Sequence, residues 1–179
     1  MTRVGMMACI VLAAGFCGAP AVAHVTLEQR QAAPGAPYKA VFRVPHGCGG
    51  SDTVRLSVTI PEGIILVKPM AKPSWQIAIV RGPYSKPFAS LHGAKMTEGV
   101  KEVTWTGRLP DTLYDEFIVT SLVSSDLVVG STLYFPVVQT CEHGEHRWLQ
   151  LPAQSAPVDE PAPSLRIIAP SNRPNEDQQ

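Results

Sequence analysis

Short alternating apolar stretches, each ended by turn residues, run through most of this chain. In residues 53–60, Val54, Leu56, Val58 and Ile60 fall on one face, and Pro61-Glu62-Gly63 follows as a turn. Comparable stretches occupy 40–44, 64–69, 75–80, 100–107, 116–122, 132–140 and 146–151. No helical periodicity persists over ten residues. The pattern predicts an all-β fold, an antiparallel Greek-key β-sandwich like an immunoglobulin or fibronectin domain, with a closed barrel as the alternative.

The composition fits one turn-rich domain. The chain has 179 residues, with 17 Pro and 14 Gly, a length typical of a single domain. Lys and Arg number 15, as do Asp and Glu. This zero net charge lacks the electrostatic attraction on which non-specific nucleic-acid binding depends, so no nucleic-acid partner is expected.

The first 23 residues have the organisation of a secretory signal peptide. Arg3 provides the positive start, residues 6–14 are apolar, and Ala21-Val22-Ala23 resembles a cleavage site. Gly15, Gly18 and Pro20 interrupt the apolar stretch, which disfavours the alternative of an uncleaved membrane anchor. Cleavage after Ala23 would release a soluble exported protein, periplasmic in location, that begins at His24.

Two cysteines remain after this cleavage. Cys9 and Cys17 leave with the signal peptide, whereas Cys48 and Cys141 stay. A pair of cysteines in an oxidising compartment is expected to form a disulfide. The alternative use of a cysteine, a lipoprotein anchor at Cys17, is disfavoured because its flank lacks the Leu of a usual lipobox.

His24 is the most informative candidate ligand. After cleavage its free α-amino group and its Nδ1 atom could chelate one metal ion in a six-membered ring. Paired nitrogens of this kind suit Cu(II), which stands at the top of the divalent affinity order. The alternative is that His24 is an ordinary first residue.

A second group of histidines surrounds the cysteines. A Cys48–Cys141 bridge would bring His46 near the segment 143–148, which carries His146 and Trp148. We therefore take His46 as a candidate ligand and His146 and Trp148 as candidate neighbours of the metal, with turn residues as the alternative. Trp75 and Trp105 lie on strand patterns and are expected in the core.

Familiar enzyme signatures are missing from the sequence. It contains no Gly-rich phosphate loop, G-x-S-x-G, H-E-x-x-H or C-x-x-C. Asp115 and Glu116 are neighbours on a predicted strand and would point to opposite faces, which makes them a poor acid–base pair. No enzymatic activity is therefore expected.

Several motifs occur in an order that resembles a known family. They are His24-Val25-Thr26-Leu27 after the signal peptide, Pro34-Gly35-Ala36, Arg43-Val44-Pro45-His46-Gly47-Cys48, Ile60-Pro61-Glu62-Gly63, Lys72-Pro73-Ser74-Trp75, Tyr114-Asp115-Glu116-Phe117, Leu133-Tyr134-Phe135-Pro136-Val137 and His146-Arg147-Trp148. Over residues 24–152 the chain is similar to the proteobacterial branch of the YcnI-like family of exported bacterial domains. The resemblance implies a cupredoxin- or fibronectin-III-like β-sandwich that binds Cu(II).

The resemblance also implies roles for individual residues. Copper in that family is held by the N-terminal histidine, which here is His24. Some members add a carboxylate from the loop after the first long strand and have a Trp beside the metal. The loop here contains His46 and no Glu, so His46 is the expected substitute ligand and Trp148 the expected metal-side Trp.

Three functions are compatible with these patterns. The first is a periplasmic Cu(II) chaperone or buffer in copper homeostasis that passes copper to other periplasmic or membrane copper-handling proteins. The others are a brace-type copper oxidase and a metal-free adhesion or assembly module. Residues 153–179 form a Pro-rich extension that is expected to be largely disordered, in which 164–169 could add an edge strand or dock.

Overall fold

The structure, a computed structural model, describes residues 24–90, 93–151 and 158–170. The predicted signal peptide, with its cleavage site and with Cys17, lies outside these residues. Within the described ranges, no helix has the length and apolar character needed to cross a membrane.

The first sheet contains four strands in the order β1-β3-β8-β5. These are β1 (Thr26–Leu27), β3 (Pro37–Val44), β8 (Asp115–Val123) and β5 (Ile64–Pro69). Every neighbouring pair is antiparallel. The short β1 and the strand β5 are the two edges of this sheet.

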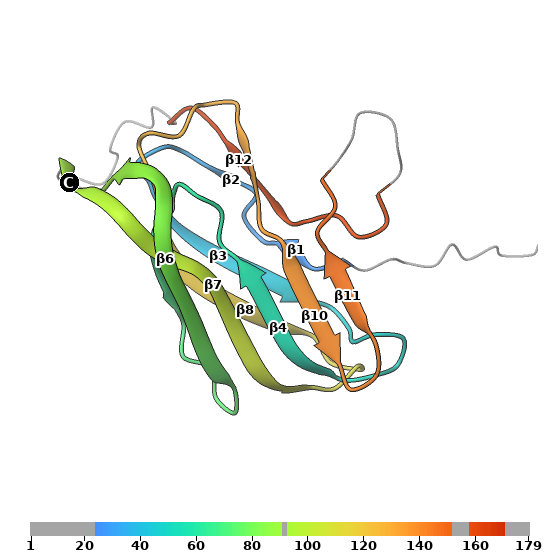
Figure 1. The fold of residues 1–179 in the computed structure, drawn as a ribbon. Helices are drawn as coiled ribbons and strands as arrows, with labels where there is room; N and C mark the ends of the chain where they lie inside the picture. Colours follow the sequence, from blue (N-terminus) through green and yellow to red (C-terminus); the bar gives the residue numbers. More distant parts are fainter. Residues whose placement is uncertain (1–23, 91–92, 152–157, 171–179) are drawn as a thin grey trace, which may run out of the picture.

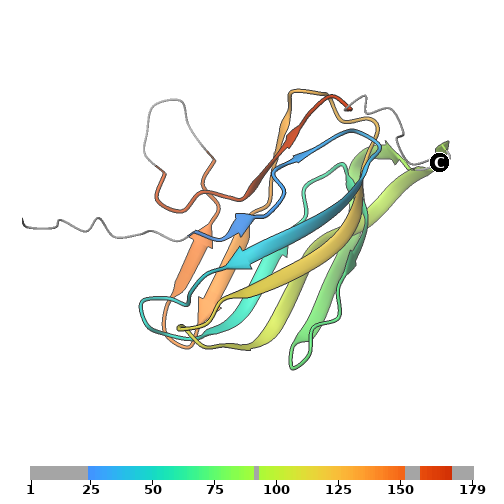
Figure 2. The same cartoon turned by 180° about the vertical axis from the view of Figure 1, so that it is seen from behind.

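The second sheet contains five strands in the order β11-β10-β4-β7-β6. These are β11 (Glu145–Trp148), β10 (Val137–Cys141), β4 (Thr53–Thr59), β7 (Lys95–Leu109) and β6 (Gln76–Ala89). All of its pairs are antiparallel as well. β11 forms the edge on the same side as β1, and β6 forms the opposite edge (Figures 1 and 2).

A small third sheet joins distant parts of the chain. β12 (Ser164–Ile167) lies between β2 (Gln31–Ala32), with which it is parallel, and β9 (Thr132–Tyr134), with which it is antiparallel. Leu165 and Ile167 of β12 are fully buried. This alternate burial fixes the segment after residue 158 against the sandwich near β1 (Figure 2).

The core lies between the two large sheets. Along strands such as β4 and β10, alternate side chains point inward and are buried, as expected for half-buried strands. Trp105 is fully buried, and Trp75 is partly buried and packs against this cluster. The largest buried side chains are those of Trp105, Trp148, Phe42, Phe117, Phe135 and Leu56.

The sandwich predicted from the sequence is confirmed, with differences in detail. The stretch 132–140 is divided at Phe135-Pro136 into β9 and β10, which belong to different sheets. Proline lacks the amide donor needed to continue a ladder, which is consistent with a break there. β6 and β7 are much longer than predicted. The segment 164–169, which could have added an edge strand, instead contains β12, the central strand of the third sheet.

Candidate metal centre

His24 is held at one edge of the sandwich by the strand that follows it. The side chains of Val25 and Leu27 are buried in the core, and Thr26 pairs with Arg43 of β3. Burial of two such side chains stabilises this attachment by about 1.5–3 kcal/mol each. The half-buried His24, next to Val25 along the strand, is therefore fixed at the edge.

The hydrogen bonding of His24 determines which ring nitrogen is available. Its Nε2 lies 3.0 Å from the backbone carbonyl oxygen of Asp159. A carbonyl can only accept, so Nε2 carries the hydrogen and donates it. In the neutral ring the lone pair then belongs to Nδ1. This is the nitrogen that a chelate with the α-amino group of His24 would require.

Trp148 lies directly against His24. The two ring centres are 5.2 Å apart in an edge-to-face arrangement. Trp148 ends β11 and is 2% exposed, and its indole Nε1 donates to Oε1 of the buried Gln139 at 3.3 Å. The predicted proximity of His24 and Trp148 is therefore present in the structure.

His146 packs against the same indole ring system. It shares a face of β11 with Trp148, two residues away, and the ring centres are 5.0 Å apart. Its Nδ1 donates to Oε1 of Glu160 at 2.8 Å, and the backbone amide of Arg147 donates to Oε2 at 3.0 Å. Burial would raise the pKa of Glu160, but these hydrogen bonds outweigh burial and hold it below its usual value.

His46 follows β3 and contacts His146. The two ring centres are 6.3 Å apart. The Nδ1 of His46 faces the carbonyl oxygen of Gly47, and the carbonyl oxygen of His46 accepts a hydrogen bond from Gln139 Nε2 at 2.7 Å. In the described part of the chain, the aromatic contacts link His46 to His146 and His24 to Trp148, and none links His46 to His24.

The predicted disulfide joins the two loops beside these histidines. Cys48 and Cys141 are bonded, with their Cα atoms 6.0 Å apart. Beside the bridge, the amide of His143 donates to Ser51 Oγ at 2.8 Å and the amide of Glu142 donates to the carbonyl of Asp52 at 2.9 Å. The loop before β4 is thus fixed to the turn between β10 and β11.

With residues 1–23 removed, the imidazole and amine of His24 would fit Cu(II) as two ligands. Within residues 24–90, 93–151 and 158–170, no three His, Cys, Asp or Glu side chains lie together as a ready metal site. Cu(II) binds well to nitrogen ligands such as an imidazole and an amine. Because both nitrogens belong to one residue, they can chelate the ion without a third side chain. His24 would hold the ion, with Trp148 excluding water on one side.

Sequence reasoning missed two side chains that organise this edge. Glu160 comes from the Pro-rich extension, where no periodic pattern indicated a contact with β11. Gln139 is 1% exposed and links Trp148, His46 and Thr53 Oγ1, the last at 2.8 Å. Its inward position could have been read from the alternation of β10, but not its partners.

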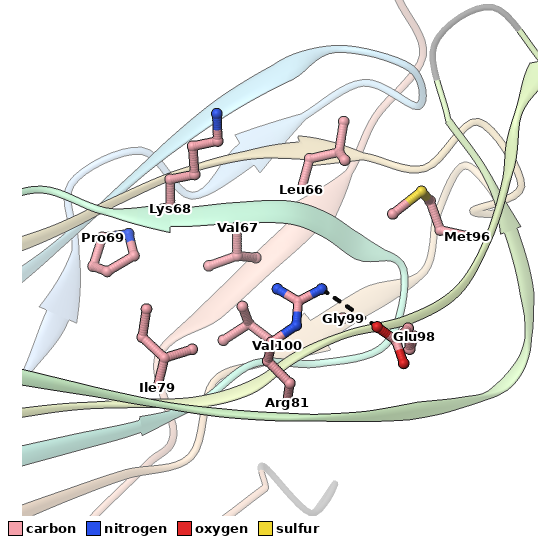
Figure 3. A pocket seen from close by; sticks show the side chains of 10 residues that line it. All are labelled: Leu66, Val67, Lys68, Pro69, Ile79, Arg81, Met96, Glu98, Gly99 and Val100. Carbon is pink, nitrogen blue, oxygen red and sulfur yellow. Dashed lines mark ion pairs between the residues drawn. The ribbon is translucent and has the colours of Figure 1, made fainter.

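Two hollows lie at the edges of the sandwich. A small one of about 190 Å³ is bounded by residues 24–27 and 161–163, together with Arg30 and Ser164. A larger one of about 400 Å³ lies at the opposite edge, between β5 and the β6–β7 pair. Its lining is mainly apolar and includes Leu66, Ile79 and Met96, with the exposed Arg81–Glu98 ion pair beside them (Figure 3).

Comparisons with known proteins support the fold and identify the family. A solved structure of an uncharacterised protein from Nocardia farcinica, described as having an immunoglobulin-like fold, is 23% identical, with a TM-score of 0.58. The match covers 81% of this chain and 98% of the other. No curated protein matches the chain.

A family model extends the relationship across the whole sandwich. It matches residues 24–167 and therefore includes His24, both cysteines, Trp148 and β12. This range covers most of the sequence, and it agrees at the family level with the resemblance to YcnI-like domains. The chain belongs to the family described as Domain of unknown function (DUF1775).

Proposed function

We propose that this protein is an exported Cu(II)-binding protein that holds copper through the amine and imidazole of His24 once Ala23 is removed. The observation that carries the proposal is the hydrogen bond from His24 Nε2 to the carbonyl of Asp159. This hydrogen bond holds the ring in the tautomer that leaves the Nδ1 lone pair available to bind a metal ion together with the amine. Metal ligands commonly have their second ring nitrogen fixed in this way.

The surroundings of His24 support a copper carrier. Trp148 covers one side of the ring, while the segment around Asp159 fixes its orientation. His24 itself is half-buried, so a bound ion would remain open to exchange with a partner. In this role the protein is a chaperone or buffer in periplasmic copper homeostasis and transfers its ion to other copper-handling proteins.

His46 remains the second imidazole ligand predicted from the sequence. Its described ring contact is with His146, so the His24 chelate alone carries the proposal. Loss of His46 should therefore affect copper at His24 much less than loss of His24 itself.

The proposal is tested by comparing Cu(II) affinity in two forms of the protein. One has a free N-terminal His24, and in the other the same N-terminus is acetylated, which converts the α-amino group of His24 into an amide. We expect much weaker binding at His24 in the acetylated form, because it has lost the amine that anchors the chelate and keeps only the imidazole. Isothermal titration against a competing chelator measures the difference.

Two variants of the cleaved protein provide the control. His24→Ala removes the imidazole half of the chelate and should abolish the tight site. His143→Ala removes an exposed histidine of the β10–β11 turn and should leave that site intact. Equal Cu(II) affinities in the two variants would contradict the assignment of His24, and absence of copper binding by the cleaved protein itself would favour a metal-free module.

A further inference from the structure

The two imidazoles of His46 and His146 form a pair across the two large sheets. His46 follows β3 of the first sheet, and His146 belongs to β11 of the second. Their ring centres are 6.3 Å apart and the ring planes are inclined by 79°. Both side chains are partly exposed. The pair is therefore accessible to a small ion.

Each ring presents one nitrogen without a described protein partner. The Nδ1 atom of His146 donates to Glu160, and the Nδ1 atom of His46 faces the carbonyl oxygen of Gly47. Both acceptors place the hydrogen on Nδ1. The lone pair of each neutral ring is consequently on Nε2, the atom that a metal would bind.

The separation of the rings fits two ligands of one ion. Imidazole nitrogens bind ions of this size at about 2.0–2.1 Å, which places ring centres roughly 6 Å apart when the nitrogens lie on opposite sides of the metal. Opposed nitrogen ligands suit the tetragonal coordination that Cu(II) prefers, with water at the remaining positions.

Both histidines are held in place, one by a buried side chain and a disulfide and the other by a half-buried carboxylate. Gln139 Nε2 binds the carbonyl of His46, and the disulfide at Cys48 fixes the same loop. Glu160 holds His146 through one carboxylate oxygen and accepts the Arg147 amide with the other. A carboxylate that accepts from Nδ1 also makes the ring a better ligand at Nε2.

We propose that His46 and His146 form a second metal site, independent of the N-terminal amine, that binds one Cu(II) ion through their Nε2 atoms. Glu160 is the positioning residue for His146. The cleaved protein would then hold one ion at His24 and a second, weaker one at this pair. The second site does not depend on the proposed function of His24.

The test removes the first site and then counts the copper that remains. The background is a protein that begins at residue 24, carries His24→Ala and has an acetylated N-terminus, so both halves of the N-terminal chelate are absent. We expect this protein to bind one equivalent of Cu(II). Adding His46→Ala or His146→Ala should abolish that equivalent, whereas adding His143→Ala should leave it. Isothermal titration gives the stoichiometry.

A fourth variant tests the role of Glu160. In the same background, Glu160→Gln should weaken Cu(II) binding by about 10–100-fold, as is common when a partner of a ligating histidine is changed. Thermal unfolding verifies that each variant is folded. If either histidine variant does not fold, the other one decides the result.

The results that would contradict the second site differ from the results that would contradict the His24 chelate. A background protein that binds no copper would overturn the second site, as would copper that persists in both histidine variants. If His46→Ala weakens only the tight site of the cleaved protein, His46 is a ligand together with His24 and the pair is not a site. Copper in the background, with equal affinities for the free and acetylated forms of the His24 protein, would support the pair and refute the His24 chelate.

Discussion

The two open edges of the sandwich are built in different ways. At one edge, β1 and β11 lie side by side, and a later part of the chain, which includes Glu160 and β12, covers them (Figures 1 and 2). At the other, β5 and β6 leave a mainly apolar hollow (Figure 3). The β1–β11 edge gathers four ring side chains, those of His24, His46, His146 and Trp148.

The difference shows where this fold can support metal chemistry. The β1–β11 edge has nitrogen donors whose orientations are fixed by hydrogen bonds and by a disulfide. The β5–β6 edge has apolar side chains together with Lys68, Arg81 and Glu98, and no histidine or cysteine among its lining residues. Among the described residues that form these two edges, the histidine donors that a nitrogen-preferring ion needs therefore lie at the β1–β11 edge.

The backbone of the β5–β6 edge is also irregular. Leu66 has a φ of 54°, a conformation that bulky side chains rarely adopt. It lies where the pairing of β5 with β8 shifts register, between Ile65 and Lys68. Such a conformation costs of order 1–3 kcal/mol. The β5–β6 edge thus contains a residue with a strained backbone, whereas the β1–β11 edge is held by a disulfide and by side-chain hydrogen bonds.

The largest loss of stability is expected from truncation of Trp148. Trp148→Ala removes a buried aromatic side chain from the β1–β11 edge, at a cost of about 3–5 kcal/mol. Ile79→Ala at the β5–β6 edge removes a side chain that is 46% exposed, and its effect should stay below about 1 kcal/mol. Urea denaturation measures both. Similar losses of stability in the two variants would contradict the view that the β1–β11 edge is packed and the β5–β6 edge is open.

Removal of the disulfide should have the next largest effect. Cys48→Ala combined with Cys141→Ala should lower the free energy of unfolding by about 2–5 kcal/mol. Cu(II) affinity at the His46–His146 pair should also fall, because a loosened loop must be ordered again on binding. Both quantities are compared with the oxidised protein at a temperature where both proteins are folded. Unchanged affinity would make the bridge a purely structural feature.

Gln139 is the next position in order of expected effect. Gln139→Ala leaves the buried Trp148 Nε1 without its acceptor and the His46 carbonyl without its donor. The expected loss is about 1–3 kcal/mol. Gln76→Ala on the exposed face of β6 is the matched control and should change stability little. Equal losses in denaturant titrations would show that the Gln139 links are not important.

Glu62 gives the β5–β6 edge a dependence on acid. Hydrogen bonds from Ser85 and then from Lys101 lower the pKa of Glu62 to about 2. Because the folded pKa is depressed, this stabilisation is fully present above the ordinary value, near 4.3, and is lost as pH falls toward about 2. Glu62→Gln should therefore cost up to about 1 kcal/mol above pH 5, and the difference from wild type should shrink toward pH 2.

Denaturation at a series of pH values measures this difference. Ser85→Ala, which removes the hydroxyl donor to Glu62, should reduce the acid dependence without eliminating it. A gap between wild type and Glu62→Gln that stays constant from pH 7 to pH 2 would contradict the role of the carboxylate.

The smallest change is expected at Leu66. Leu66→Gly loses a side chain that is 42% exposed, but it relieves the positive φ, which glycine adopts readily. The two effects oppose each other, so stability should remain within about 1 kcal/mol of wild type. A loss well above that value in urea denaturation would show that the contacts of the Leu66 side chain stabilise this edge more than the positive φ destabilises it.

The sequence predicted the strands more completely than the site. Alternation identified β4 and the buried Trp105, since period-2 burial is a local property. The division at Pro136 and the long β6–β7 hairpin depend on which sheet each segment joins, which local patterns do not reveal. The disulfide could be predicted because only two cysteines, Cys48 and Cys141, lie outside the predicted signal peptide.

Contacts at the candidate site were harder to predict because they join distant segments. Glu160 meets His146 from a Pro-rich stretch with no strand periodicity. His46 was predicted as a partner of His24, whereas its described ring contact is with His146. The importance of His24 followed from its expected position at a new N-terminus and from the family resemblance, not from hydrophobic patterning.

The most direct test of copper binding at the β1–β11 edge uses the three tryptophans as internal reporters. Substoichiometric Cu(II) is added to the cleaved, ¹⁵N-labelled protein, and the indole N–H signals are followed by NMR. Trp148 contacts His24, whereas Trp105 lies on β7, three strands away from β11 in the same sheet. We predict that paramagnetic broadening removes the Trp148 signal first and leaves those of Trp105 and Trp75. Earlier or equal loss of the Trp105 and Trp75 signals would contradict a copper site at His24.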